Sequence, residues 1–210
     1  MFTRAIRRKV IASRLDQPKQ RKKPTLWFVN SMSDLFHASI PEEYLDKVFH
    51  VIGSTPWHTY QILTKRAERM RKYFSHHPVP ENVWLGVTVE DRRHGFPRLD
   101  ALRKINAPVR FISAEPLLED LEGLDLVGIE QIIVGGESGH RGRPMKPAWA
   151  DRIFDIARRS NTAFLFKQWG RWGPDGIARS KKRNGRLYRG RIWDEYPTQT
   201  ALDFAQEHTI

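Results

Sequence analysis

Six short apolar runs divide the chain at regular intervals, and each of them ends in polar or charged residues. Their starts lie 22 to 33 residues apart, and each run is almost continuously apolar rather than alternating. That pattern is typical of strands that are buried on both faces. The runs occupy residues 26–31, 59–64, 84–89, 109–114, 131–136 and 163–168.

Helical patterns fill most of the gaps between these runs. Apolar residues recur at helical spacing within 44–52, 65–74, 97–106 and 147–160. Ser39 and Glu42, with Pro41 between them, resemble a capping box at the start of the first of these helices. The leucines of 115–130 favour a further short helix over the sheet. This alternation predicts an α/β fold: a parallel (β/α) barrel or partial barrel, similar to a TIM barrel.

The charge of the chain is concentrated in two segments. Residues 1–23 carry nine Lys and Arg against one Asp, and residues 171–191 carry eight against one. The whole chain has a net charge of +12, so everything else is slightly acidic. We therefore predict a basic N-terminal segment at 1–23, a (β/α) barrel-like domain at 24–170 and a basic C-terminal extension at 171–210 that packs on the barrel. A short terminal helix is expected at 199–206.

The composition limits the cellular locations and the metal or redox sites that this chain can have. No run approaches the roughly 18 apolar residues that span a bilayer, and the first fifteen residues combine positive charge with a broken apolar segment, unlike a secretory signal. These features predict a cytoplasmic protein with no membrane partner. The chain contains no Cys, so it forms no disulfides and its own thiolates ligate neither zinc nor an iron–sulfur cluster. No metal site is predicted.

Reactive side chains follow the first three runs directly. Because the carboxyl ends of parallel strands meet at one mouth, these residues are expected to form part of one site. Two adjacent cations suit a phosphate or a carboxylate. The alternative is ordinary structure, with a capping carboxylate after the first run and a solvated helix face after the second. The ligand-binding candidates from this half of the sheet are Asn30, Asp34, Lys65, Arg66 and Glu90.

The later runs end in the catalytic candidates, which are Glu115, Glu137 and Lys167. Facing carboxylates suit acid–base work, a divalent metal or an amino group. Lys167 suits a phosphate contact or, if desolvated, the role of a base. The alternative is that one of the acids after the strands is paired with Lys65 or Lys167 as a structural ion pair. Gly135 and Gly136 permit close approach of a ligand and expose N–H groups to an anion, or else form a tight turn.

Two further ligand-binding candidates, Gln168 and Trp169, close the last run. Trp169 has two interpretations: an aromatic wall on which a ligand stacks, or a plug for the barrel.

The C-terminal basic segment is the candidate nucleic-acid surface, because basic segments attract polyanions. Its cations are interleaved with Tyr188 and Trp193, which suits stacking on bases. The same aromatic residues equally suit a hairpin pinned to the barrel, with its tight turn at Asn184-Gly185. The nucleic-acid candidates are Lys181, Lys182, Arg183 and Arg186.

Six segments resemble, in order, the motifs of a phage and prophage protein family of unknown function, the phage gene product 37 / gene product 68 family. They are FVNSMSDLFH (28–37), YQILTKR (60–66), WLGVTVE (84–90), RFISAEPLL (110–118), IIVGGESG with RPM (132–145) and FLFKQWG (164–170). The resemblance covers about residues 25–170, and RIWDEYP at 191–197 resembles the closing segment of that family.

Longer members of that family are similar to radical S-adenosylmethionine enzymes and carry a cysteine cluster before the first matching strand. The resemblance therefore implies a radical-S-adenosylmethionine-like barrel, with S-adenosylmethionine near Gly135, Gly136 and Glu137. Since this chain has no Cys, it implies an N-terminally truncated and catalytically incomplete member, without an iron–sulfur cluster of its own. It equally implies one half of a split protein, completed by a separately encoded, cysteine-containing partner.

Three functions follow from these observations. The first is the incomplete radical-S-adenosylmethionine-like barrel with a ligand site at the ends of its strands. The second is a nucleic-acid-binding accessory protein that uses its basic segments. The third is a cofactor-free (β/α) hydrolase or lyase that uses the catalytic candidates.

Overall fold

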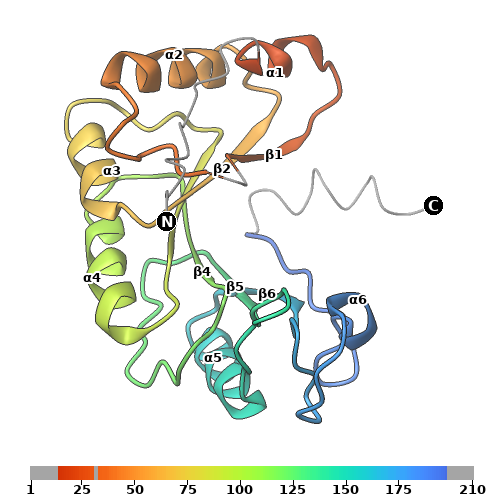
Figure 1. Cartoon of the computed structure of the whole chain (residues 1–210). Coiled ribbons are helices and arrows are strands. Elements are labelled where there is room, and N and C mark those ends of the chain that lie inside the picture. Colours follow the sequence, from red (N-terminus) through yellow and green to blue (C-terminus); the bar gives the residue numbers. More distant parts are fainter. Residues whose placement is uncertain (1–13, 31–32, 198–210) are drawn as a thin grey trace, which may run out of the picture.

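The six apolar runs form the six strands of one sheet in the computed structural model (Figure 1), which describes residues 14–30 and 33–197. The strands pair in the order β1-β2-β3-β4-β5-β6, and every pair is parallel. The predicted boundaries agree with the observed ones to within two residues. The strands are β1 (Leu26–Val29), β2 (Thr59–Thr64), β3 (Val83–Thr88), β4 (Val109–Ala114), β5 (Gln131–Gly135) and β6 (Ala163–Gln168).

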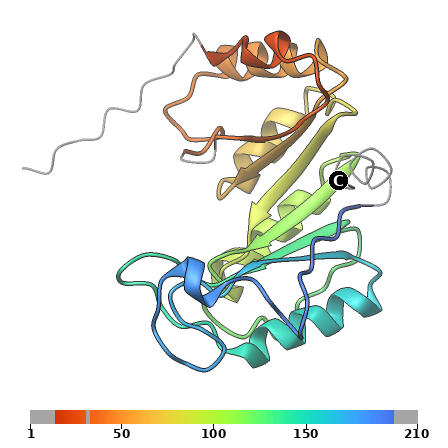
Figure 2. The ribbon, with the colours of Figure 1, turned by 90° about the vertical axis from the view of Figure 1, so that its right-hand side faces the viewer.

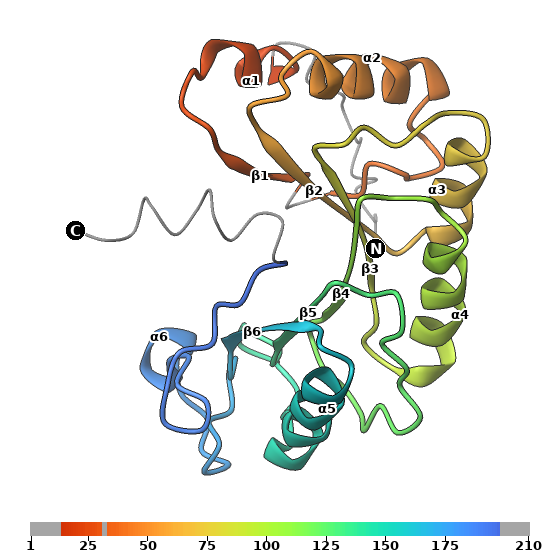
Figure 3. The same cartoon turned by 180° about the vertical axis from the view of Figure 1, so that it is seen from behind.

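The sheet is curled into a partial barrel with the helices outside it (Figure 2). This confirms the predicted α/β partial barrel of parallel strands. Four of the helices connect successive strands, as the view from behind shows (Figure 3). The helices are α1 (Gln17–Gln20), α2 (Glu42–Gly53), α3 (Ala67–Phe74), α4 (Arg92–Arg103), α5 (Pro147–Arg159) and α6 (Lys181–Asn184).

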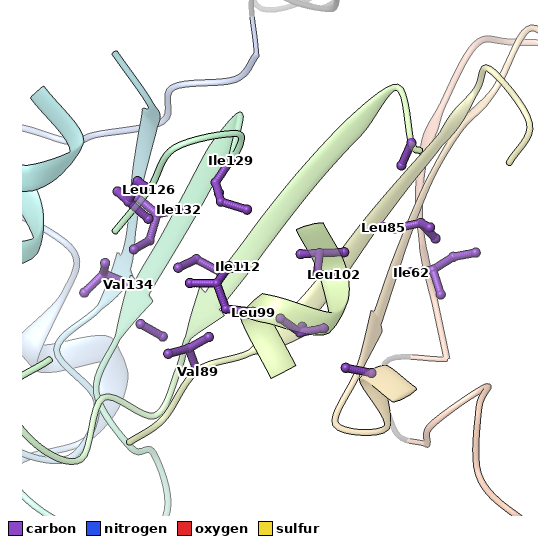
Figure 4. Close-up of a cluster of buried hydrophobic side chains, with 14 of the residues drawn as sticks. Ile62, Leu85, Val89, Leu99, Leu102, Ile112, Leu126, Ile129, Ile132 and Val134 are labelled. Atoms are coloured by element: carbon purple, nitrogen blue, oxygen red, sulfur yellow. The ribbon is translucent and has the colours of Figure 1, made fainter. Parts of the chain in front are cut away.

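The main core lies between the sheet and these outer helices (Figure 4). Leu99 and Leu102 of α4, both almost fully buried, belong to the same cluster as Ile62, Leu85 and Ile112 of the strands. Alternate strand residues face the helices, so a strand contributes every second side chain to this core.

The opposite, concave face of the sheet carries a second, smaller apolar cluster. Trp84, Phe111 and Ile133 form its centre. A Cβ at Gly86 would lie 2.4 Å from the Phe111 ring, so glycine on β3 makes room for the aromatic ring on β4. Strand residues are therefore buried on both faces, which explains why the runs are continuously apolar.

The segment from 185 to 197 covers the outer edge of β6. Phe166 donates its N–H to the carbonyl of Trp193 at 2.9 Å, and Tyr188 stacks on the Phe166 ring at 4.9 Å. Trp193 packs edge-on against Phe154 of α5 at 4.6 Å. The aromatic residues of this extension thus pack on the barrel. Among the described residues, β1 pairs only with β2.

Two local predictions about the helices are wrong. The capping box does not form: α2 begins at Glu42 after Pro41 without a side-chain cap, because the Ser39 hydroxyl is hydrogen-bonded to His37 Nδ1 at 2.7 Å. Residues 115–130 form no helix. Gly123 and Gly128 adopt positive φ there, and the leucines cover the sheet from an irregular loop.

Two boundaries also differ from the prediction. The helix expected at 97–106 begins at Arg92, since Asp91 caps it by accepting the N–H of His94 at 2.7 Å, and Pro97 lies inside it. Asn184-Gly185 is not a hairpin turn. Asn184 is the last residue of α6, and Gly185 follows it with φ +68°.

Several predictions fall outside what the structure tests. The helix at 199–206 and residues 1–13 of the basic N-terminal segment lie outside the described residues, and the domain limits at 23/24 and 170/171 stay predictions. Within 14–30 and 33–197, none of the helices has the length and apolar content to cross a membrane.

Candidate functional site

Asp34 ties the first two strand ends together. Its carboxylate accepts hydrogen bonds from the Thr64 hydroxyl at 2.7 Å, from Arg66 Nη1 at 2.8 Å and from the N–H of Lys65 at 3.2 Å. It also accepts the N–H of Phe36 at 3.0 Å, which is a local turn. With four donors around it, Asp34 fixes the backbone that presents Lys65, and Arg66 is held by the same carboxylate.

Lys65 reaches the end of the next strand. Its ammonium lies 2.5 Å from Glu90 Oε1, and the second carboxylate oxygen of Glu90 lies 3.9 Å from Arg98 Nη1 of α4. Arg98 is itself positioned by donating to the carbonyl of Thr88 at 3.0 Å. The Glu90 side chain is mostly buried, whereas the Lys65 side chain is about half exposed. A fixed carboxylate thus orients an accessible ammonium.

Glu115 forms the equivalent pair on the other half of the sheet. Lys167 Nζ donates to Glu115 Oε2 at 2.7 Å, and Gln168 Nε2 donates to Glu115 Oε1 at 2.7 Å. These partners lie on β6, two strands away from β4. The carboxylate crosses β5 at Gly135, where a Cβ would lie 3.2 Å from Glu115 Cγ and Oε1. Gly135 therefore leaves the space through which Glu115 reaches Lys167.

Gln168 is 4 % exposed, and its Oε1 is buried without a hydrogen-bond partner. The amide orientation is set by Glu115, because a carboxylate accepts only and so takes the NH₂ end of the amide. A buried amide oxygen without a donor is uncommon and costs free energy. This orphaned acceptor lies one residue beyond Lys167, within the same cluster.

Gly136 packs against the backbone of Trp169. A Cβ there would lie 2.0 Å from the carbonyl oxygen of Trp169, and its N–H donates to the carbonyl of Gln168 at 2.9 Å. Gly136 therefore permits close approach of the backbone that follows β6. Trp169 is buried in the main core, its ring lies tilted against that of Phe166 with the centroids 4.9 Å apart, and its Nε1–H donates to the carbonyl of Leu187 at 2.8 Å. It therefore packs beneath the extension.

Glu137 is engaged by Arg143 from the loop that follows β5. Arg143 donates Nε and Nη2 to the two carboxylate oxygens at 2.7 and 2.9 Å, and its backbone N–H adds a third bond at 2.8 Å. These hydrogen bonds lower the pKa of Glu137 to about 2. In turn, the hydrogen bond to Glu137 raises the pKa of Arg143, with a smaller contribution from the charge of Glu90. Glu137 is thus a stable anion rather than a group that exchanges protons near neutral pH.

The candidate residues share the carboxyl edge, but only some of them are in contact. The structure joins Lys65 to Glu90 and Glu115 to Lys167. Asn30 adopts φ +59° at the end of β1 and lines a separate cavity of about 500 Å³ between α1, β1 and α2. A second cavity of about 460 Å³, bordered by Glu130 and Ala163 among others, lies at the amino edge of the sheet.

The nucleic-acid candidates divide into two kinds. Lys181, Lys182 and Arg183 of α6 are exposed, and none has an acidic partner within the part of the chain that the structure describes. Arg186 differs, because it is paired with Asp194 and donates to the carbonyl of Phe166. Its role is to attach the extension to β6.

Sequence reasoning missed Arg98 and Arg143. Arg98 lies within the predicted helix at 97–106, where nothing marks it as facing Glu90, and Arg143 lies in a loop without periodicity. Residues that hold a carboxylate from a following helix or loop leave no spacing signal of their own. Among the described residues, no cluster of three or more His, Asp or Glu side chains has the arrangement to hold a metal ion.

The fold and this edge define an α/β partial-barrel protein with paired carboxylates and cations at the carboxyl ends of its strands. A family model for a protein of unknown function, DUF5131, matches residues 1–197. The chain therefore belongs to the DUF5131 family. Neither the curated proteins nor the solved structures include a significant match.

Proposed function

We propose that this protein binds a small anionic ligand at the carboxyl edge of its sheet, with Lys65 and Lys167 as the cations that receive it. One observation supports this: each Lys side chain is about half exposed, at 49 % and 53 %, whereas the carboxylate that holds it is only 15 % or 17 % exposed. An ammonium has three donors, so the carboxylate leaves donors of each Lys for a phosphate or carboxylate of the ligand.

In a cofactor-free hydrolase or lyase at this edge, Glu115 and Lys167 are the acid–base pair. They are in contact at 2.7 Å although their strands, β4 and β6, are separated by β5, and proton transfer requires hydrogen-bond reach. Glu137 is a less suitable base, because a carboxylate with a pKa of about 2 is a weak proton acceptor near neutral pH. Its role in this proposal is to fix the loop that carries Arg143.

Calorimetric titration with inorganic phosphate and with citrate tests the proposal. A charge-assisted hydrogen bond contributes about 1.5–3 kcal/mol, so Lys65→Met and Lys167→Met should each weaken binding about tenfold or more. Lys104→Met is the matched control, since this exposed Lys caps the end of α4. Binding of neither anion, or binding that Lys104→Met weakens as much, contradicts the proposal.

A second candidate function is nucleic-acid binding by α6, in an accessory role. The three exposed cations of Lys181–Arg183 support it, since each is free of an acidic partner among the described residues. Neutralising all three should lower the slope of log affinity against log salt by about 3 units on duplex DNA. An unchanged slope contradicts this function. Arg186, being paired with Asp194, is left out of the variant.

The phage origin and the radical S-adenosylmethionine chemistry stay predictions. The residues present do not fit a [4Fe–4S] cluster, because the chain supplies no Cys thiolate. The Gly135-Gly136 turn is already filled by Glu115 and the backbone of Trp169, so it offers S-adenosylmethionine no open cradle in this conformation. A cluster would need thiolates from a separate, cysteine-containing partner.

Anaerobic reconstitution of the isolated chain with iron and sulfide tests this. We expect no specifically bound cluster by absorbance or electron paramagnetic resonance. A stoichiometric [4Fe–4S] centre would overturn the expectation.

A further inference from the structure

The basic helix α6 is attached to the chain directly beyond Lys167. Asn184, the last residue of α6, donates its side-chain N–H groups to the carbonyls of Gly170 and Arg171 at 3.0 and 2.8 Å. The N–H of Trp169 also points to the carbonyl of Gly185 at 3.4 Å. Residues far apart in the sequence are thereby held side by side, so α6 adjoins the strand end that carries the Glu115–Lys167 pair.

This attachment limits how far the cations of α6 lie from Lys167. Gly170 is three positions after Lys167 in the chain, which is at most about 11 Å of extended chain. A four-residue helix is about 6 Å long. Allowing for the Asn184 side chain and its 3.0 Å hydrogen bond to Gly170, the backbone of Lys181 lies within about 25 Å of the backbone of Lys167. A short polymer therefore has the reach to contact both.

The surface between them is cationic and its acids are already neutralised. Arg171 lies between Lys167 and α6, and its side chain has no acidic partner among the described residues. From 171 to 194 the acids are Asp175 and Asp194. Asp175 is held by Arg179 through both carboxylate oxygens, and Asp194 is paired with Arg186. The remaining charge of this surface is therefore positive.

A neighbouring loop extends the same surface. Trp172 donates Nε1–H to the carbonyl of Gly142 at 2.7 Å, which joins the loop after β5 to the loop after β6, and Figure 2 shows this loop beside α6. Arg141 of that loop is exposed. We name the cations of these adjoining segments the α6 track: Arg141, Lys167, Arg171, Lys181, Lys182 and Arg183.

We propose that the anion received by Lys167 is a phosphate of a single-stranded nucleic acid, and that the next phosphates of the same strand lie along the α6 track. This inference rests on the proposed function, because it names the ligand class of the same site. A row of separate cations matches repeated phosphates better than one small anion. The four residues of α6 are too few to act as a recognition helix in the major groove, which favours a flexible strand.

Fluorescence anisotropy with two labelled oligothymidylates tests the proposal. One is about 3 nucleotides long and the other about 12, inside the about 4–16-nucleotide range of single-strand sites. Lys167→Met should weaken both about tenfold. The triple variant Lys181→Ala, Lys182→Ala, Arg183→Ala should weaken only the longer strand, and should lower its salt slope by about 2 units.

A charge-matched control changes Lys47, Lys72 and Lys104 to Ala, which are exposed on α2, α3 and after α4. This control should retain wild-type affinity for both strands. An equal loss in the control contradicts the α6 track, since it would show net charge alone to be responsible. Phosphatidylserine vesicles that fully displace the longer strand from the protein contradict the choice of nucleic acid over a lipid surface.

The two proposals fail in distinguishable ways. One outcome is that inorganic phosphate binds through Lys167 but Lys167→Met leaves the affinity for the longer strand unchanged. The anion site and α6 are then separate surfaces, and only the present inference is wrong. If no phosphate binds through Lys167 and the longer strand depends on α6 alone, the proposed anion site is wrong as well, and the second candidate function, binding by α6, is supported. Equal affinity of the two strands for the unmodified protein also overturns the inference.

Discussion

Replacing Gly136 by Ala provides a direct test of the packing at the carboxyl edge. The added Cβ would lie 2.0 Å from the carbonyl oxygen and 2.8 Å from the carbonyl carbon of Trp169, both backbone atoms. Relief requires the backbone after β6 to move, which breaks the 2.9 Å bond from Gly136 N–H to the carbonyl of Gln168. Overpacking costs about 1–3 kcal/mol and the lost hydrogen bond about 1 kcal/mol, so unfolding should be easier by about 2–4 kcal/mol.

For a chain of this size, each kcal/mol shifts Tm by about 2–4 °C, so Gly136→Ala should melt roughly 4–16 °C lower, as followed by circular dichroism. Gly53→Ala is the matched control. No heavy atom lies within 4 Å of a Cβ at Gly53, which is the last residue of α2. There Ala should stabilise by about 0.4–1 kcal/mol. If Gly136→Ala melts at the same temperature as the wild type, the packing argument is refuted. The alternative interpretation, that Gly136 permits close approach of a ligand, would then be favoured.

Three further predictions concern single side chains. Asp34→Ala removes the acceptor of four hydrogen bonds and should destabilise by about 2–4 kcal/mol in chemical denaturation; a loss under about 0.5 kcal/mol contradicts this. The pKa of Glu137 is lowered from 4.5 to about 2, so its stabilising contribution is present above pH 4.5 and is lost as the pH falls toward 2. Glu137→Gln should therefore flatten that part of the acid-unfolding profile, and an identical profile would exclude the Arg143 pair as its cause. Arg186→Ala should destabilise by about 1–2 kcal/mol and Lys182→Ala by less than about 0.5; equal effects would show that Arg186 does not anchor the extension.

The strands were predictable because burial on both faces leaves a continuous apolar run. Trp84 and Leu85 are neighbours in one run, yet they belong to clusters on opposite faces of the sheet. The loop at 115–130 was not predictable in the same way. Its leucines are buried as a helix would bury them, but Gly123 and Gly128 take positive φ, a choice that the apolar pattern alone does not reveal.

The sequence predicted the members of the site and the alternative of an ion pair with Lys65 or Lys167, but not which acid meets which Lys. Lys65, Glu90 and Lys167 were identified because each follows a strand. That Glu115 passes the neighbouring strand to meet Lys167 depends on the missing side chain at Gly135. Strand order and side-chain reach decide such contacts, and neither is encoded in the local sequence.

The two edges of the sheet restrict how copies of this chain can associate. The outer edge of β6 is occupied by the backbone of 193–195, whereas β1 pairs on one side only among the described residues. Head-to-tail growth would join the β1 edge of one copy to the β6 edge of the next, and the covered edge of β6 prevents it. A continuous sheet between two copies is therefore restricted to β1 against β1. A two-fold axis makes that junction antiparallel and self-terminating, so this route leads to a closed pair rather than to a fibre.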